Sequence, residues 1–127
     1  MLALSNALRY FLYRDGTDMR KGFDGLSGVV RQALNKDPLS GDVFIFLNKR
    51  RTQIKLLLWE RDGFSVYHKR LERGTYELPL YKGIDAVELR SDELMLILQG
   101  ISLKSIRRRE RFDSRKNSLQ FSLNHAL

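Results

Sequence analysis

Residues 43–80 contain four stretches with strand character, separated only by short connections. Each stretch is rich in β-branched, aromatic or leucine side chains, and each connection carries turn residues such as Asn, Asp or Gly. Connections of two to five residues can join only antiparallel neighbours. The sequence therefore predicts a β-meander, preceded by a short strand over 9–14. Its four strands are Val43–Leu47, Gln53–Trp59, Phe64–Glu72 and Thr75–Leu80.

The connection Asp62-Gly63 predicts how the second and third of these strands pair. If these two residues form the turn, Arg61 lies opposite Phe64, and Lys55 lies opposite Arg70. Opposed residues share a face of the sheet. One face then gathers Ile54, Leu56 and Leu58 with Tyr67, Lys69 and Leu71, and is the better core. The other, mixed face gathers Lys55, Leu57 and Trp59 with Val66, His68 and Arg70.

Two segments have helical character. Apolar residues recur at spacings of three and four from Met19 to Leu34, after a possible cap at Thr17 or Asp18, which predicts a helix of about four turns. A shorter helix is predicted over 91–99, with Gly100 ending it. The fold class is therefore α+β: an antiparallel meander sheet packed against one long helix, with a second short helix.

Basic residues are concentrated near the C-terminus. The chain has 127 residues, with 23 Lys and Arg against 15 Asp and Glu, a formal net charge of +8. Residues 104–127 alone carry seven basic and two acidic residues. We expect one α+β domain over 1–103 and a basic, mobile arm over 104–127. A surplus of this sign favours nucleic acid as a partner.

Several kinds of chemistry are disfavoured by the sequence. Without cysteine there is no disulfide or thiolate metal site. No apolar run reaches the roughly 20 residues of a membrane span, so we expect a soluble, cytoplasmic protein without a membrane partner. His68 and His125 lack zinc-site spacing, and no phosphate-binding glycine motif occurs. We therefore expect no catalytic residue, metal or cofactor, and no enzymatic activity.

The candidate contacts to nucleic acid are exposed cations of two regions. Each Lys or Arg can neutralise one phosphate, mostly without regard to base sequence. In the predicted sheet and its turns they are Lys49, Arg50, Arg51, Lys55, Lys69, Arg70 and Arg73, and in the arm Lys104, Arg107, Arg108, Arg109 and Arg111. Trp59 and Val66, on the mixed face, are candidates for a protein-interaction patch instead.

The run from Tyr10 to Leu26, which includes Thr-Asp-Met-Arg-Lys-Gly-Phe-Asp-Gly-Leu, resembles a known family. It is similar to the TnpB, or Orf2-like, accessory proteins of the insertion-sequence-sixty-six transposons. The likeness continues through 37–48, the Ile54–Trp59 segment and the basic run 107–111, and covers about residues 9–112. The resemblance implies an accessory role in bacterial DNA transposition, beside a separate transposase that carries the catalytic acids.

Three functions follow as hypotheses. The favoured one is a non-catalytic accessory protein of a mobile element that binds DNA, such as transposon ends, or stabilises the transposase complex, with homo-oligomerisation open. The alternative is a pure protein-interaction subunit that docks on the transposase without touching DNA. The third is a metal-dependent phosphodiesterase using turn aspartates such as Asp15 and Asp18, which are otherwise explained as turn and cap residues.

Overall fold

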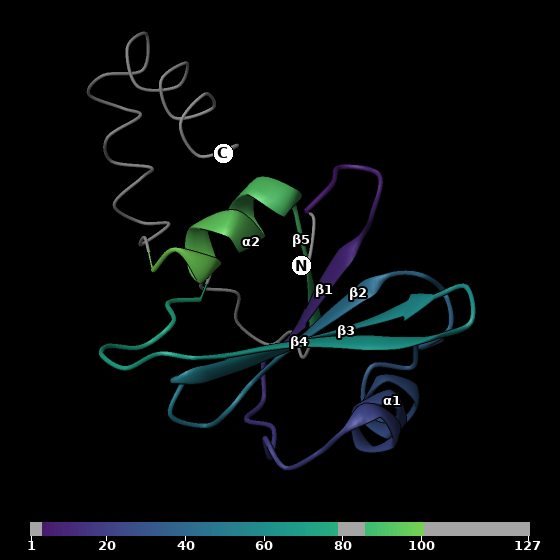
Figure 1. The fold of residues 1–127 in the computed structure, drawn as a ribbon, viewed down its shortest axis with the longest axis horizontal. Coiled ribbons are helices and arrows are strands. Elements are labelled where there is room, and N and C mark those ends of the chain that lie inside the picture. Colours follow the sequence, from purple (N-terminus) through teal and green to yellow (C-terminus); the bar gives the residue numbers. More distant parts are fainter. Residues whose placement is uncertain (1–3, 79–85, 101–127) are drawn as a thin grey trace, which may run out of the picture.

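The computed structural model describes residues 4–78 and 86–100. In this part of the chain, five strands form one sheet with the order β4-β3-β2-β1-β5. Figure 1 shows this sheet between two helices, one on each side. The elements are β1 (Tyr10–Tyr13), α1 (Phe23–Gln32), β2 (Val43–Leu47), β3 (Gln53–Glu60), β4 (Gly63–Arg70), β5 (Ala86–Leu89) and α2 (Ser91–Leu98).

The sheet is mixed, which corrects the prediction of a purely antiparallel one. The meander β2-β3-β4 is antiparallel as predicted. However, β1 pairs with β2 in parallel, with Tyr10 opposite Val43. The connection between them contains α1 and is long enough to carry the chain back to the starting end of the sheet, which parallel pairing requires.

The β3–β4 hairpin turns at Arg61-Asp62, because Glu60 pairs with Gly63. The predicted turn at Asp62-Gly63 is therefore wrong, and every pairing is shifted by two residues. Because side chains alternate with a period of two, this shift preserves the predicted faces. It does change partners: Lys55 lies opposite His68, and not opposite Arg70.

Each face of the sheet has its own hydrophobic core. On one face, Leu94 and Ile97 of α2 pack with inward residues of the strands such as Ile45 and Leu56. On the other, Leu26 and Val30 of α1 pack with a smaller set that includes Phe44. The expected arrangement, a sheet against one long helix, thus becomes a three-layer sandwich. Neither helix is long and apolar enough to span a bilayer, as far as the described residues extend.

The first helix is shorter than the predicted one, whose apolar stripe runs from Met19 to Leu34. It begins at Phe23 with Gly22 at its N-cap. It ends near Ala33, where Asn35 adopts a left-handed φ of 52° and the Lys36 N–H donates to the Val30 carbonyl at 3.1 Å. The second helix, predicted over 91–99, is confirmed as Ser91–Leu98 and is followed by Gly100 at a φ of 76°.

One predicted strand is absent and one strand was missed. Residues 75–78 of the predicted strand 75–80 are not part of the sheet, and the remaining two lie outside the described residues. β5 instead forms the edge beside β1, with Leu12 opposite Val87. Its four residues alternate too briefly to be recognised before a helix. The arm 104–127 also lies outside the described residues.

Candidate nucleic-acid interface

Three loops meet at one end of the sheet. β1, β2 and β4 end there and β3 begins there, because Leu47 pairs with Ile54 and Gln53 pairs with Arg70. We call this the basic end, and define it by residues 14–21, 48–52 and 69–77. The opposite end consists of residues 9, 42, 60–62 and 88–93.

The two ends differ in charge. Among the described residues, the basic end carries nine Lys and Arg against four Asp and Glu, whereas the opposite end carries three against six. The cations of the basic end come from segments far apart in the sequence, and the sheet brings them together. A surface of this kind attracts polyanions.

The turn 48–52 presents three consecutive cations, Lys49, Arg50 and Arg51, all exposed. The Asn48 side chain orders this turn. Its Oδ1 accepts the N–H groups of Thr52 at 2.8 Å and Gln53 at 2.9 Å, and its Nδ2 donates to the Thr52 hydroxyl at 2.9 Å. The cations are therefore carried on a defined backbone.

The loop 14–22 packs directly against that turn. A Cβ built on Gly16 would lie 3.0 Å from the Lys49 Cα, closer than an ordinary contact, so any larger residue would have to push the turn away. The Thr17 N–H donates to the Leu47 carbonyl at 2.7 Å, which ties the loop to the end of β2. Loop and turn are thus one continuous surface.

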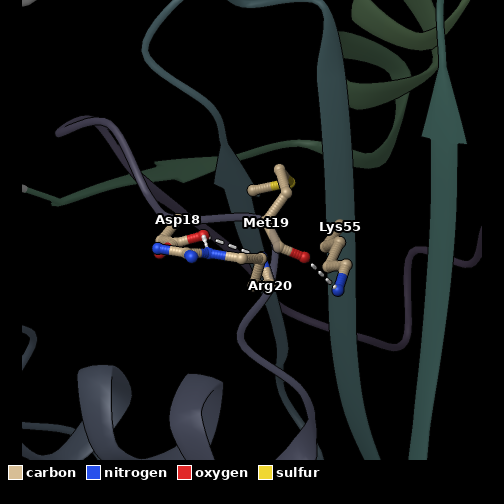
Figure 2. A network of polar contacts seen from close by, with 4 residues as sticks. All are labelled: Asp18, Met19, Arg20 and Lys55. Carbon is tan, nitrogen blue, oxygen red and sulfur yellow. Dashed lines mark hydrogen bonds and ion pairs between the residues drawn. The ribbon is translucent and has the colours of Figure 1, made fainter.

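Within this loop, Arg20 is held by Asp18. Its Nη2 lies 2.7 Å from Asp18 Oδ2, and its backbone N–H donates to Asp18 Oδ1 at 2.9 Å (Figure 2). The hydrogen bonds from Arg20 lower the pKa of the Asp18 carboxyl to about 2. The Arg20 side chain nevertheless remains 92% exposed.

Lys55 lies beneath the same loop, on the α1 face of β3. It is only 9% exposed, and its Nζ donates to the carbonyls of Met19 at 2.8 Å and Lys21 at 2.9 Å (Figure 2 shows the first of these bonds). These two bonds lie just before α1, which begins at Phe23 and not after Thr17 or Asp18. Partial burial, followed by the charges of Lys55 and Arg70, lowers the pKa of the neighbouring His68.

The segment after β4 completes the basic end. The Leu71 N–H donates to the Thr52 carbonyl at 2.8 Å and the Tyr76 N–H to the Arg51 carbonyl at 2.7 Å. Arg70 forms a 3.3 Å ion pair with Glu72, both exposed. Lys69 and Arg73 are also exposed.

The structure thus gathers six of the predicted contact residues on one exposed surface: Lys49, Arg50, Arg51, Lys69, Arg70 and Arg73. Lys55 is close to them but buried. Sequence reasoning missed Arg14, Arg20 and Lys21, because it assigned the last two to a helix. One feature of the sequence could have pointed to the loop 14–22: Lys55 is a lysine within the otherwise apolar run 54–59, which indicates that its charge needs a partner from elsewhere in the chain. The predicted arm cations, 104–111, lie outside the described residues.

The two predicted protein-interaction residues lie on the α1 face of the β3–β4 hairpin. Trp59 is half-buried and makes an edge-to-face contact with Phe64, with ring centroids 5.0 Å apart. Val66, also half-buried, packs against the core under α1.

The turn aspartates considered for metal chemistry do not come together. Asp15 and Asp18 lie at the basic end, whereas Asp42 and Asp62 lie at the opposite end. No group of three or more His, Asp or Glu side chains is placed to hold a metal ion within residues 4–78 and 86–100.

Comparison with known proteins identifies the family. Residues 8–108 match the model of the family described as IS66 Orf2-like protein. The chain belongs to the IS66 Orf2-like family. This membership confirms the resemblance and associates the protein with IS66 transposition in an accessory role; the family is not a known catalytic one.

Two relatives come from Sinorhizobium fredii, and both are described only as uncharacterized. Protein y4jC is 30% identical over 109 residues, 86% of this chain and 92% of the relative. Protein y4hO is 31% identical over 101 residues, 80% of this chain and 87% of the relative. No solved structure matches the chain.

Proposed function

We propose that this IS66 Orf2-like protein binds duplex DNA through the basic end and so assists a separate transposase of the same element. The observation that carries the proposal is the clustering of exposed cations from three loops at one end of the sheet, while the other end has an acidic surplus. Such an asymmetry orients the protein toward a polyanion.

The exposed cations are suited to phosphates more than to base edges. Lys49, Arg50 and Arg51 project from a turn, where each side chain can meet a phosphate oxygen. Binding through such contacts is largely independent of base sequence and falls steeply with salt. The arm 104–127 adds further cations to this interaction.

The test is fluorescence-anisotropy binding of labelled transposon-end and scrambled duplexes over a salt series. The variant Lys49→Gln/Arg50→Gln removes two charges from the basic end, and Arg9→Gln/Arg61→Gln removes two from the opposite end. Loss of two phosphate contacts lowers the slope of log K against log salt by about 1.8. We expect that loss in the first variant and an unchanged slope in the second.

Equal losses in both variants would contradict an oriented interface, and absence of DNA binding by the full chain would overturn the proposal. The second outcome would favour the protein-interaction function. The test would then be to substitute the half-exposed Trp59 and Val66 and to measure binding to the transposase.

A further inference from the structure

Lys55 is a largely buried lysine that has no carboxylate partner in the described part of the chain. Its neighbours along β3, Ile54 and Leu56, are fully buried, and none of the ion pairs among the described residues involves it. Burying an ammonium costs several kcal/mol unless its charge and its donors are satisfied. An apolar side chain at this position would avoid that cost, so the lysine has a use that packing alone does not explain.

The two bonds of Lys55 act on the backbone of the loop. The carbonyls of Met19 and Lys21 both point at Nζ, at 2.8 and 2.9 Å. The residue between them, Arg20, sends its side chain away from Lys55 to Asp18, as Figure 2 shows. Lys55 therefore holds the backbone of residues 19–21 from the side of the sheet, while the side chains of Arg20 and Lys21 are exposed to solvent.

This segment adjoins the turn 48–52 through the contact of Gly16 with Lys49. A phosphate backbone that lies along the turn and across this loop would meet the exposed Arg20 and Lys21. In Arg20 the guanidinium is already oriented by Asp18, whose exposed carboxylate can be exchanged for a phosphate.

Building on the proposed function, we infer that Arg20 and Lys21 are DNA-phosphate contacts and that Lys55 is a positioning residue that holds their loop in place. Lys55 acts through the backbone and does not touch the DNA. Immobilising a loop before binding lowers the entropy cost of ordering it on the ligand. Lys55 thus contributes to DNA binding indirectly, by keeping the loop of Arg20 and Lys21 ordered.

The direct contacts are tested with Arg20→Gln/Lys21→Gln, two exposed substitutions that leave the core intact. If both residues contact phosphates, the salt slope falls by about 1.8 and affinity falls on the order of 10- to 100-fold near 0.1 M salt. Lys36→Gln/Arg31→Gln, which removes two charges from α1 and the residues after it, is the matched control and leaves the slope unchanged. Unchanged DNA binding in Arg20→Gln/Lys21→Gln would overturn the inference.

Positioning is tested by a double-mutant cycle with Lys55→Met. This variant should lose affinity in the otherwise unchanged chain, yet add no further loss to Arg20→Gln/Lys21→Gln, because the held side chains are already gone. Additive losses would show that Lys55 acts on DNA independently of this loop, and would overturn the positioning role.

Two measurements do not depend on DNA binding, and the first of them does not require Lys55→Met to fold. In the unsubstituted protein, the ammonium of Lys55 should give a slowly exchanging NMR signal, because it is buried and hydrogen-bonded. Amide hydrogen exchange at residues 18–22 should be slow, and should accelerate in Lys55→Met. A rapidly exchanging ammonium would contradict the positioning role. If the full chain bound no DNA while these signals were as expected, the proposed function would fail but the loop anchor would stand.

Discussion

The two ends of the sheet differ in how their charges are used. At the opposite end, Arg9 pairs with Glu88 at 2.8 Å and Arg90 pairs with Asp92 at 3.0 Å, so cations are compensated locally. At the basic end, the loops are joined by backbone groups, by the Asn48 amide and by Lys55. Lys49, Arg50 and Arg51 take part in no ion pair among the described residues.

This difference indicates that most exposed cations of the basic end are not needed to hold its loops together. Backbone groups, the Asn48 amide and the buried Lys55 hold the loops together, and the positive charge of the 49–51 turn is left for a partner. The exceptions, Arg20 with Asp18 and Arg70 with Glu72, are exposed pairs that a phosphate can replace.

The largest effect is expected from Asn48→Ala. This change removes three side-chain hydrogen bonds from the basic turn, and should lower the free energy of unfolding by about 2–4 kcal/mol. It should also weaken DNA binding, although no charge is removed, because the three cations lose their fixed backbone. Urea unfolding and fluorescence anisotropy measure the two effects.

The matched control is Asn6→Ala, which removes an acceptor of the hydroxyl of Ser91, a residue of the opposite end. It should leave DNA affinity unchanged. An equal loss of affinity in both asparagine variants would break the comparison between the ends.

A smaller effect, of opposite sign at the two ends, is expected for two buried tyrosines. Tyr10 and Tyr76 are each 1% exposed. The Tyr10 hydroxyl, near the opposite end, accepts the Ser5 N–H at 2.7 Å and donates to the Ser5 carbonyl at 2.9 Å. The Tyr76 hydroxyl, at the basic end, has no hydrogen-bond partner within residues 4–78 and 86–100, and burial raises its pKa to about 12.

Tyr10→Phe should therefore lower the free energy of unfolding by about 1–2 kcal/mol, while Tyr76→Phe should leave it unchanged or raise it by up to about 1 kcal/mol. Urea unfolding of both variants measures the difference. A destabilising Tyr76→Phe would mean that its hydroxyl is satisfied after all, which an absorbance titration with an ordinary phenol pKa would corroborate.

The smallest effect concerns pH. The pKa of His68 is lowered from 6.5, first by burial and then by Lys55 and Arg70. The folded protein therefore binds a proton at His68 less readily than the unfolded chain does, and this contribution to stability falls as pH drops below about 6.5. NMR titration should show the low pKa, and Lys55→Met should raise it part of the way.

The matched control for pH is His68→Gln. Its stability should depend less steeply on pH between the lowered pKa and 6.5, because the group that titrates is gone. An unchanged pH dependence in His68→Gln would show that His68 does not carry the pH effect. A His68 pKa that does not change in Lys55→Met would show that the charge of Lys55 does not lower it.

Local patterns were sufficient for the elements with short-range causes. The β2-β3-β4 meander follows from short connections and α2 from its start and stop signals, and the faces of the β3–β4 hairpin survived a wrong turn because a two-residue shift preserves alternation. Of the candidate interface, the consecutive cations 49–51 could be found from sequence because a polar turn exposes them.

Long-range contacts decided the rest. The apolar spacing from Met19 to Leu34 predicts one helix, but the carbonyls of Met19 and Lys21 bind Lys55, more than 30 residues away, and the helix begins only at Phe23. The parallel pairing of β1 and the addition of β5 likewise depend on strands distant in sequence.

The sequence by itself determined the fold class, most strands, the second helix, the surplus of positive charge and the family. The tertiary structure alone decided that 14–21, 48–52 and 69–77 share one end of the sheet, that Lys55 is buried under a loop, and that acidic residues gather at the other end. The physical reason is that periodicity and turn chemistry act over a few residues, whereas strand order and the fate of a buried charge depend on which distant segments meet in space.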